Sequence, residues 1–261
     1  MSSLVCAMKC GRPDTLTIVF NSYVHHAGRQ KNLPMNTYFE GYKILSTLNS
    51  TVIWIAETES RWYLEHEVRV YDFLRSYIAQ HSVERVVLMG FSAGGYSAIR
   101  QGILLSCACF PNHIPQIVSF AINPQTGFRG DLLKKILRTV EDERWSHGNL
   151  GDDPIILNQF RPDLAQNNMC NIAHFARSFP YKDNVNFHIY YDEGNPIDRL
   201  FAEDLIGLPG FHHHPEPLAL PHRLGGQELW KDFWQSGKIT EALADRADFP
   251  ASLTYLDEII I

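Results

Sequence analysis

The sequence contains no cluster of basic residues. It has 23 Lys and Arg against 29 Asp and Glu, which gives a formal net charge of −6 over 261 residues. A surface that binds nucleic acid needs clustered cations that displace the counterions of the phosphates. We therefore expect a protein that binds no nucleic acid and whose substrate is not a polyanion.

Long apolar runs are also absent. No segment approaches the roughly 20 apolar residues that a membrane helix requires. The start, MSSLVCAMK, lacks the charged beginning and the apolar stretch of a secretory leader. The five cysteines form no C-x-x-C pair and show no spacing typical of a disulfide framework. These absences predict a cytoplasmic protein with reduced thiols and without membrane association.

Short runs rich in β-branched residues alternate with helical patterns. Strands are predicted over Leu16–Phe20, Thr51–Ile55, Arg85–Met89, Ile117–Ala121 and Val185–Tyr191, and a last strand within Gly210–Leu220. Helical patterns between the first three strands cover Tyr38–Leu48 and Glu65–Ala79. This alternation predicts βαβ units and a parallel sheet. Since 45% of the residues are hydrophobic, the chain can bury a full core, and we expect one α/β domain over residues 1–261.

The interval between Asn123 and Asp183 interrupts the alternation, because it is too long for one crossover between strands. Its two helical patterns are Leu132–Val140 and Leu164–Arg177, and the stretch Gly148–Pro162 between them is rich in Gly, Asp, Asn and Pro. We interpret residues 124–183 as a helical insertion that covers the active site. An ordinary pair of structural helices with a long loop is the alternative.

The pentapeptide Gly90-Phe91-Ser92-Ala93-Gly94 follows directly on the predicted strand Arg85–Met89, and a helical pattern begins just after it. A serine between small residues at a strand-to-helix turn is typical of a nucleophile elbow, whose strained turn exposes the hydroxyl. Glycines two residues before and after the serine allow the helix to pack close to the strand. The motif predicts Ser92 as a nucleophile. A glycine-rich turn that binds phosphate or only turns the chain is the alternative.

A serine hydroxyl is a weak nucleophile and needs a base, which a third group orients. With such an elbow the chain order is serine, acid, histidine. Two acids follow the strand Val185–Tyr191: Asp192 at its end and Asp198 in the turn beyond it. Asp198 could instead cap a helix over Arg199–Leu205, and Asp192 could form a turn before Gly194. We favour Asp198, because an acid on a loop reaches a histidine more easily, and keep Asp192 as the alternative.

Four of the twelve histidines come after these acids, namely His212, His213, His214 and His222. His222 follows the last predicted strand at the head of a helical segment, and the 24 residues from Asp198 leave room for one helix and one strand. We therefore predict His222 as the base, with a solvent-facing or helix-capping imidazole as the alternative. Consecutive residues of a strand point to opposite faces, so we expect no metal site from the three adjacent histidines.

An attacking serine also requires donors for the oxyanion that forms. The first is expected to be the backbone N–H of Ala93, and the second an N–H of the loop that begins at Asn21, from Asn21 or Ser22. This loop lacks the HGGG sequence of many esterases. Candidate substrate contacts are Phe91 in the elbow and the aromatic pair Trp62-Tyr63, for which plain packing is an equal alternative.

With its G-F-S-A-G-G motif, a downstream acid and His222 in this order, the chain resembles the α/β-hydrolase superfamily over roughly residues 16–237. The resemblance implies a mostly parallel sheet flanked by helices. It also implies Ser92 as nucleophile, His222 as general base and acid, and Asp198 as the orienting carboxylate. The missing HGGG loop and the second aspartate are departures from the pattern.

A looser similarity rests on three short segments. Trp62-Tyr63, Ile197-Asp198-Arg199 and the stretch from Pro221 to Gly237 look like those of small hydrolase-like proteins associated with acyl chemistry of polysaccharides or glycans. We expect a cofactor-free serine hydrolase that acts on an ester or thioester of a small-molecule or glycan acyl substrate. The alternatives are an acyltransferase with an alcohol acceptor, a lyase with the same three residues, and a noncatalytic binding protein.

Overall fold

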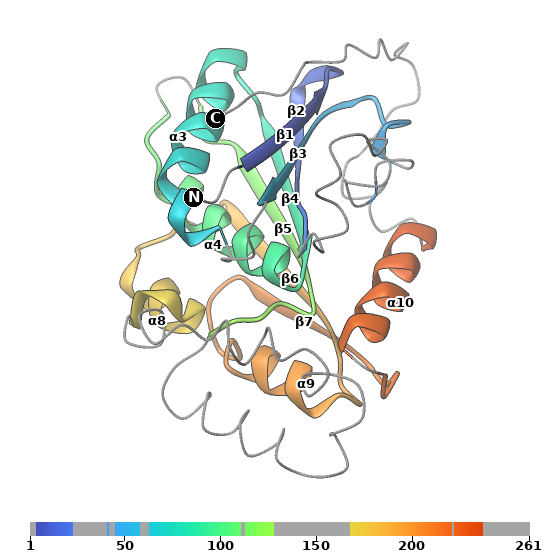
Figure 1. The fold of residues 1–261 in the computed structure, drawn as a ribbon. Coiled ribbons are helices and arrows are strands. Elements are labelled where there is room, and N and C mark those ends of the chain that lie inside the picture. Colours follow the sequence, from blue (N-terminus) through green and yellow to red (C-terminus); the bar gives the residue numbers. More distant parts are fainter. Residues whose placement is uncertain are drawn as a thin grey trace.

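The structure, a computed structural model, describes residues 4–22, 41, 45–57, 63–110, 113–127, 168–220 and 222–236. Within these residues, seven strands form one sheet in the order β1-β3-β2-β4-β5-β6-β7 (Figure 1). The strands are β1 Leu4–Lys9, β2 Arg12–Phe20, β3 Ser50–Glu57, β4 Arg85–Phe91, β5 Gln116–Ile122, β6 Val185–Asp192 and β7 Phe211–Glu216. Only β1 is antiparallel to its neighbour, β3, among the strands described. The predicted α/β fold with a mostly parallel sheet is confirmed.

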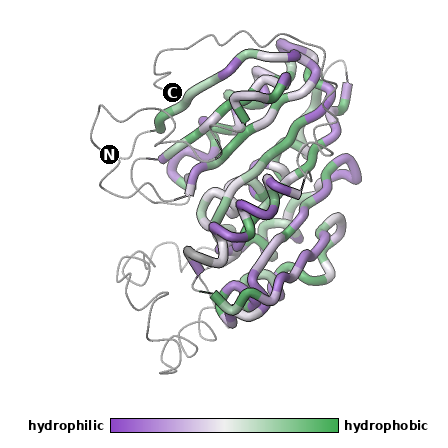
Figure 2. Tube along the Cα trace, turned by 90° about the vertical axis from the view of Figure 1, so that its right-hand side faces the viewer, coloured by the Kyte–Doolittle hydropathy of each residue, from purple (hydrophilic) through white to green (hydrophobic). Residues whose placement is uncertain are grey.

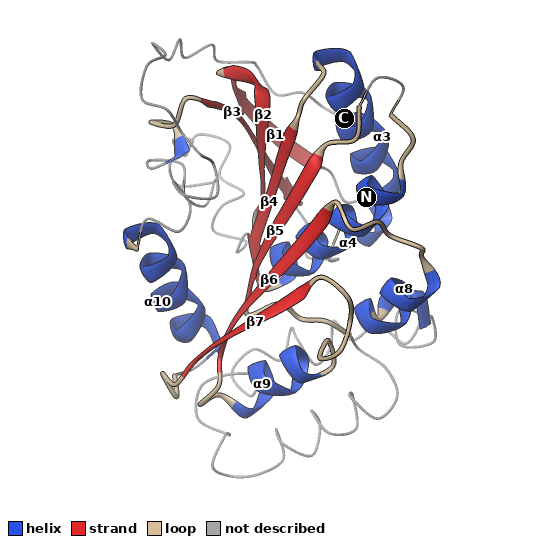
Figure 3. Ribbon diagram, turned by 180° about the vertical axis from the view of Figure 1, so that it is seen from behind, coloured by secondary structure: helices blue, strands red, loops and turns tan. Residues whose placement is uncertain are grey.

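Helices cover both faces of the sheet. Helices α3 (Glu67–His81) and α4 (Ala93–Cys107) lie on one face, and α10 (His222–Gln235) lies on the other (Figure 3). The shorter helical elements are η2 Leu64–His66, η4 Asn168–Cys170, α8 Ile172–Ser178 and α9 Pro196–Glu203. In the part of the chain that the structure describes, no helix is long and apolar enough to span a bilayer.

Side chains of the central strand enter two separate cores, because successive residues of a strand point to opposite faces. In β4, Val86 and Leu88 belong to the core below α3 and α4, whereas Val87 and Met89 belong to the core beside α10. All four are fully buried, as expected for a parallel strand that is covered on both faces. Hydrophobic segments run along the strands in Figure 2. The strand that leads to Ser92 is thus held from both sides.

The strand predictions succeed in the parallel part of the sheet and are less accurate at its edges. Each of the first five predicted strands lies inside an observed one. The strand expected within Gly210–Leu220 is shorter, because the backbone N–H groups of the segment from Leu218 to Leu220 turn toward the Asp192 carboxylate. Strand β1 was not predicted, since Val5 is its only β-branched residue and its pattern is weak.

The helix predicted over Glu65–Ala79 corresponds to α3. The continuous helix predicted over Leu164–Arg177 is wrong for the described residues, where α8 begins only at Ile172. Asn171 has an extended backbone, and its side-chain oxygen accepts a hydrogen bond from the His174 N–H (3.0 Å), which caps the helix there. The pattern Leu132–Val140, most of Tyr38–Leu48 and residues 128–167 of the predicted insertion lie outside the described residues.

Candidate active site

Ser92 joins the end of β4 to the start of α4. Its backbone has φ 54° and ψ −116°, a combination that residues other than glycine rarely adopt. Two hydrogen bonds hold it: the Ser92 N–H donates to the carbonyl of Ile122 (2.9 Å), and the Tyr96 N–H donates to the carbonyl of Ser92 (3.0 Å). The strained turn is therefore supported by the neighbouring strand β5 and by the first turn of α4.

Two glycines allow this turn to be so tight. A Cβ atom on Gly90 would overlap the backbone of Gly94, and a Cβ atom on Gly94 would overlap the carbonyl of Phe20 at the end of β2. Both positions therefore require glycine. The second contact also shows that α4 begins directly against the end of β2.

His222 is the first residue of α10 and is 8% exposed. Its Nε2 lies 3.0 Å from Oγ of Ser92, and its Nδ1 is hydrogen-bonded to Oδ1 of Asp198. An ionised carboxylate can only accept hydrogen bonds, so the neutral imidazole carries its proton on Nδ1. The lone pair of Nε2 is then available to the Ser92 hydroxyl. The imidazole thus links the hydroxyl and the carboxylate in one chain of hydrogen bonds.

The two candidate acids, both buried, have different partners. Asp198 contacts the imidazole of His222. Asp192 accepts four hydrogen bonds of 2.8–3.1 Å from the backbone N–H groups of Gly194, Leu218, Ala219 and Leu220. Asp198 is therefore the acid that contacts the histidine, whereas Asp192 holds the loop that precedes His222.

The helix cap considered for Asp198 is formed by Asn195. Its side-chain oxygen accepts hydrogen bonds from the N–H groups of Ile197 (3.0 Å) and Asp198 (3.2 Å). The helix accordingly begins at Pro196, not at Arg199 as predicted. Sequence reasoning missed Asn195, although an asparagine directly before a proline is a typical helix start.

The charge of Asp198 changes the titration of His222. Burial disfavours the imidazolium and by itself lowers the pKa of His222, but the charge and hydrogen bond of Asp198 outweigh it, so the pKa lies above its usual value. Burial also raises the pKa of Asp198, and the positive charge of His222 opposes that shift. The contact with Asp198 therefore stabilises the imidazolium that forms when His222 takes a proton.

The candidate oxyanion donors lie near the start of α4. Ala93 is the first residue of that helix, so its N–H has no acceptor within the helix. The N–H of Asn21 donates to the carbonyl of Ile55 (2.9 Å), which is incompatible with its predicted use as an oxyanion donor. Ser22 is the next residue of the loop that follows β2, and helix α4 begins against the start of this loop. Ser22 therefore remains the predicted second donor.

The predicted substrate contacts have different environments. Tyr63 is 4% exposed, and its hydroxyl lies 2.7 Å from the carbonyl oxygen of Asn21 and 3.0 Å from that of Ile55. Tyr63 is therefore part of the core and not an exposed stacking surface, whereas Trp62 lies outside the described residues. Phe91 is half-buried and stacks on the His222 ring. Of the three residues, the structure brings Phe91 into contact with His222.

The histidine triplet lies on β7. His212 and His214 stack on His188 of β6 with ring centroids 5.1 and 5.3 Å apart, while His213 contacts Tyr191 on the opposite face. Among the residues described, no three His, Cys, Asp or Glu side chains are arranged to hold a metal ion. The side chains of the triplet therefore contact side chains of the paired strand β6 on both faces of the sheet.

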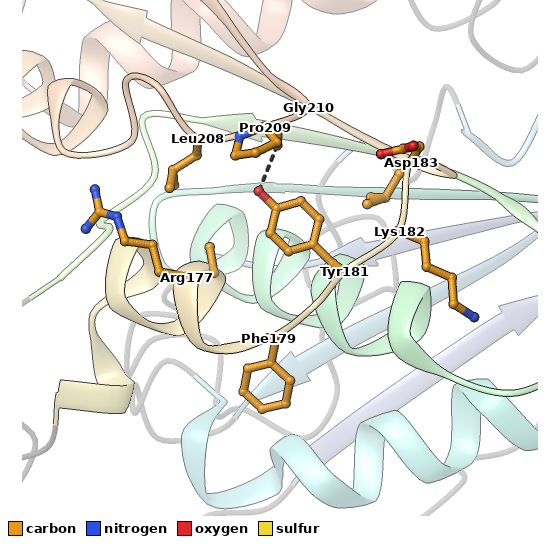
Figure 4. A pocket seen from close by; sticks show the side chains of 10 residues that line it. Arg177, Phe179, Tyr181, Lys182, Asp183, Leu208, Pro209 and Gly210 are labelled. Atoms are coloured by element: carbon orange, nitrogen blue, oxygen red, sulfur yellow. Dashed lines mark hydrogen bonds between the residues drawn. The ribbon is translucent and has the colours of Figure 1, made fainter.

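A cavity of about 430 Å³ opens at the opposite end of β6, beside Val185 (Figure 4). Within it the hydroxyl of Tyr181 donates to the carbonyl of Pro209 (2.8 Å), and the side chains of Arg177 and Lys182 extend in different directions. Asp192 ends β6 after eight residues, so this cavity is a full strand length away from the Ser92 side of the sheet. It contains none of the predicted site residues.

Comparison with solved structures identifies proteins of the same architecture at low sequence identity. Carboxyl esterase 2 of Tuber melanosporum matches with a TM-score of 0.59 and 14% identity, over 92% of this chain and 81% of the esterase. Brefeldin A esterase, described as a bacterial homologue of human hormone sensitive lipase, matches with a TM-score of 0.58 and 13% identity, over 92% and 72% of the two chains.

A chain of the Glycosylation Associate Protein (Gap123) complex of Streptococcus agalactiae also matches, with a TM-score of 0.56 and 15% identity. The match covers 90% of this chain but only 43% of that longer one. No protein-family model and no curated protein sequence matches this chain. The mostly parallel sheet, the helices on both faces and these structural matches together show that the chain has the α/β-hydrolase fold.

Proposed function

We propose that this protein is a serine hydrolase that cleaves an ester or thioester through an acyl-enzyme on Ser92. The observation that carries the proposal is the hydrogen-bonded chain from Ser92 through His222 to Asp198, with 3.0 Å between Oγ and Nε2. A hydroxyl becomes an effective nucleophile when a positioned base takes its proton and a third group orients that base. The strained backbone of Ser92 supports the same role, because strain of this kind concentrates at functional sites.

In the proposed reaction, Oγ of Ser92 attacks the substrate carbonyl carbon while Nε2 of His222 takes the hydroxyl proton. The N–H groups of Ala93 and Ser22 stabilise the oxyanion of the tetrahedral intermediate. The bond to the leaving group then breaks, and the leaving group receives the proton from Nε2. Water attacks the acyl-enzyme in the same way, with His222 again as the base, and releases the carboxylic acid. Asp198 holds Nδ1–H and stabilises the imidazolium in both halves of the reaction.

Side chains and backbone groups of the protein account for each nucleophilic attack and each proton transfer in this scheme, so the proposal invokes no cofactor. It retains the expectations of a small-molecule or glycan acyl substrate and of a cytoplasmic protein. Acyl transfer is the second candidate, since a hydroxyl of an acceptor can replace water in the second step. It is supported by the match to a chain of a complex that is named for glycosylation, although the likeness concerns the fold.

Labelling with a fluorophosphonate tests the proposal directly. We expect the wild type to be labelled on the peptide that contains Ser92, as identified by mass spectrometry, and to hydrolyse p-nitrophenyl esters of short acids. Ser92→Ala should abolish labelling and ester hydrolysis, whereas Ser97→Ala, which changes a buried serine of the same helix, should retain both. A folded wild-type protein that is neither labelled nor active on esters would contradict the proposal and favour the alternative of a noncatalytic binding protein.

The two candidate reactions differ in the fate of the acyl group. With a p-nitrophenyl ester as donor, simple hydrolysis releases the free acid at a rate that added glycerol or glucose leaves unchanged. Acyl transfer instead yields the acylated alcohol in proportion to the alcohol concentration, as measured by mass spectrometry. The ratio of acylated alcohol to free acid therefore distinguishes the two.

A further inference from the structure

The acid and the histidine lie on two segments that a fully buried asparagine joins. Asn195 accepts hydrogen bonds through Oδ1 from the N–H groups of Ile197 and Asp198, at the start of α9. Through Nδ2 it donates to the carbonyl of Leu220 (2.9 Å), two residues before His222. One planar amide therefore contacts the backbone of the acid and the backbone that leads to the histidine.

The loop that leads to His222 is held from a second side by the end of β6. The Asp192 carboxylate accepts hydrogen bonds from the backbone N–H groups of this loop, from Leu218 to Leu220. Asn123, which is 1% exposed, accepts a hydrogen bond from the Asp192 N–H (3.0 Å), and its side-chain N–H lies 3.4 Å from the carbonyl of His222. These contacts tie the histidine loop to the sheet. Asn195 ties the same loop to α9, the helix that carries Asp198.

We propose that Asn195 is a positioning residue. It sets the placement of Asp198 relative to His222 because its side chain is hydrogen-bonded to the backbone at Asp198 and to the backbone of the loop before His222 at the same time. The proposal rests on the proposed function of the three residues. Its physical basis is that 24 residues separate the acid and the histidine in the chain, so their alignment depends on noncovalent contacts. A buried amide fixed by three hydrogen bonds provides a rigid link, because each lost bond would leave a buried polar group without a partner.

The substitution Asn195→Ser separates the two roles of this side chain. Serine is also a good helix cap, so its hydroxyl retains the acceptor for the first turn of α9. It is too short to reach the carbonyl of Leu220, so the link between the two segments is lost. The matched control is Asn184→Ser, which removes an amide hydrogen bond of the same kind, from Asn184 to the carbonyl of Pro115 (2.7 Å), at the opposite end of the sheet.

We expect Asn195→Ser to lower the second-order rate constant of fluorophosphonate labelling by about 10- to 100-fold, the range expected when catalytic groups are misplaced by up to about 1 Å. The pH at half-maximal rate should also move down, because a looser contact with Asp198 stabilises the imidazolium less. The loss of folded protein alone lowers the rate but leaves this midpoint unchanged. Asn184→Ser should show the wild-type midpoint and the wild-type rate per folded molecule.

The pKa of His222, measured from its ring proton resonances by NMR, provides a readout that requires no reaction. A wild-type labelling rate and a wild-type His222 titration in folded Asn195→Ser would overturn the positioning role. If the wild type itself is not labelled, the proposed function fails, and the NMR titration still tests whether Asn195 aligns Asp198 and His222. Should Asn195→Ser not fold, Asn195→Thr retains a capping hydroxyl in a larger side chain and is measured in the same way.

Discussion

The ring of Phe91 stacks on the imidazole of His222, with centroids 5.4 Å apart and planes inclined by 25°. Phe91 directly precedes Ser92 in the chain, so the residue next to the serine also packs against the imidazole of His222. Such a contact limits the orientations that the imidazole can adopt. It connects β4 to α10 across the face of the sheet on which α10 packs.

We predict that Phe91→Leu slows fluorophosphonate labelling of Ser92 by about 10-fold, because the imidazole gains orientations in which Nε2 faces away from the hydroxyl. The rate constant is measured per folded molecule. Phe110→Leu is the matched control, since Phe110 stacks on His113 outside this site, with centroids 6.3 Å apart. Equal rate constants for the two variants would contradict a role of the Phe91 ring in holding His222.

Gly226 of α10 also lies against the Phe91 ring. A Cβ atom at this position would overlap the ring, so Gly226→Ala forces Phe91 or α10 to move, and His222 lies one turn earlier in that helix. We predict slower labelling together with a loss of about 1–3 kcal/mol in the free energy of unfolding from overpacking. Gly102→Ala in α4 meets the ring of Phe187 at 2.8 Å and serves as the control. It should affect stability without slowing the labelling of the folded protein.

The two aspartates should respond differently to loss of charge. Asp198→Asn is predicted to lower turnover by several powers of ten, by analogy with the serine-protease triad, while the protein stays folded. It should also move the acidic limb of the pH–rate profile to lower pH, because the charge that raises the pKa of His222 is gone and only burial remains. Kinetics with p-nitrophenyl esters over a pH series measure both effects.

Asp192→Asn should act mainly on stability. The amide cannot accept all four backbone N–H groups that the carboxylate binds, and each hydrogen bond to a charged group contributes about 1.5–3 kcal/mol. We expect a decrease of at least about 2 kcal/mol in the free energy of unfolding, measured with urea. If Asp192→Asn instead abolished turnover at unchanged stability and Asp198→Asn did not, the two assignments would be reversed.

The stacked histidines predict a dependence of stability on pH. Burial, together with the nearby His214 and His212, lowers the pKa of His188 to about 4. Because the unfolded chain takes up this proton near pH 6.5 and the folded protein only near pH 4, the free energy of unfolding should fall as the pH decreases through this window. His188→Phe retains a ring between Phe120 and His212 but cannot titrate.

Urea unfolding at about pH 7 and about pH 4.5 measures this difference, which should be smaller in His188→Phe than in the wild type. His174→Phe, at an exposed position of α8, controls for the loss of an imidazole outside the stack. The interpretation would be wrong if His188→Phe lost as much stability on acidification as the wild type.

The parallel part of the fold could be predicted from the sequence because its strands are short β-branched runs and Ser92 follows one of them in a distinctive motif. The choice between Asp192 and Asp198 could not be settled in this way. Both lie at or just beyond the end of the same predicted strand. They differ in the partners of their carboxylates, which are backbone N–H groups for Asp192 and the His222 imidazole for Asp198, and these partners include residues that follow β7 in the chain. The burial of Tyr63 was likewise beyond the sequence pattern, since it depends on carbonyl oxygens at Asn21 and Ile55.

Ser92 and His222 lie 130 positions apart in the chain, and this separation has a consequence for synthesis. A chain leaves the ribosome with its amino terminus first, so β2, β4 and β5 are available to build the serine turn well before α10 exists. A serine hydroxyl without an imidazole is a weak nucleophile. Under the proposed mechanism, nascent or truncated chains therefore present an unactivated serine, which becomes reactive only when the last strand and the last helix described here have folded onto the sheet.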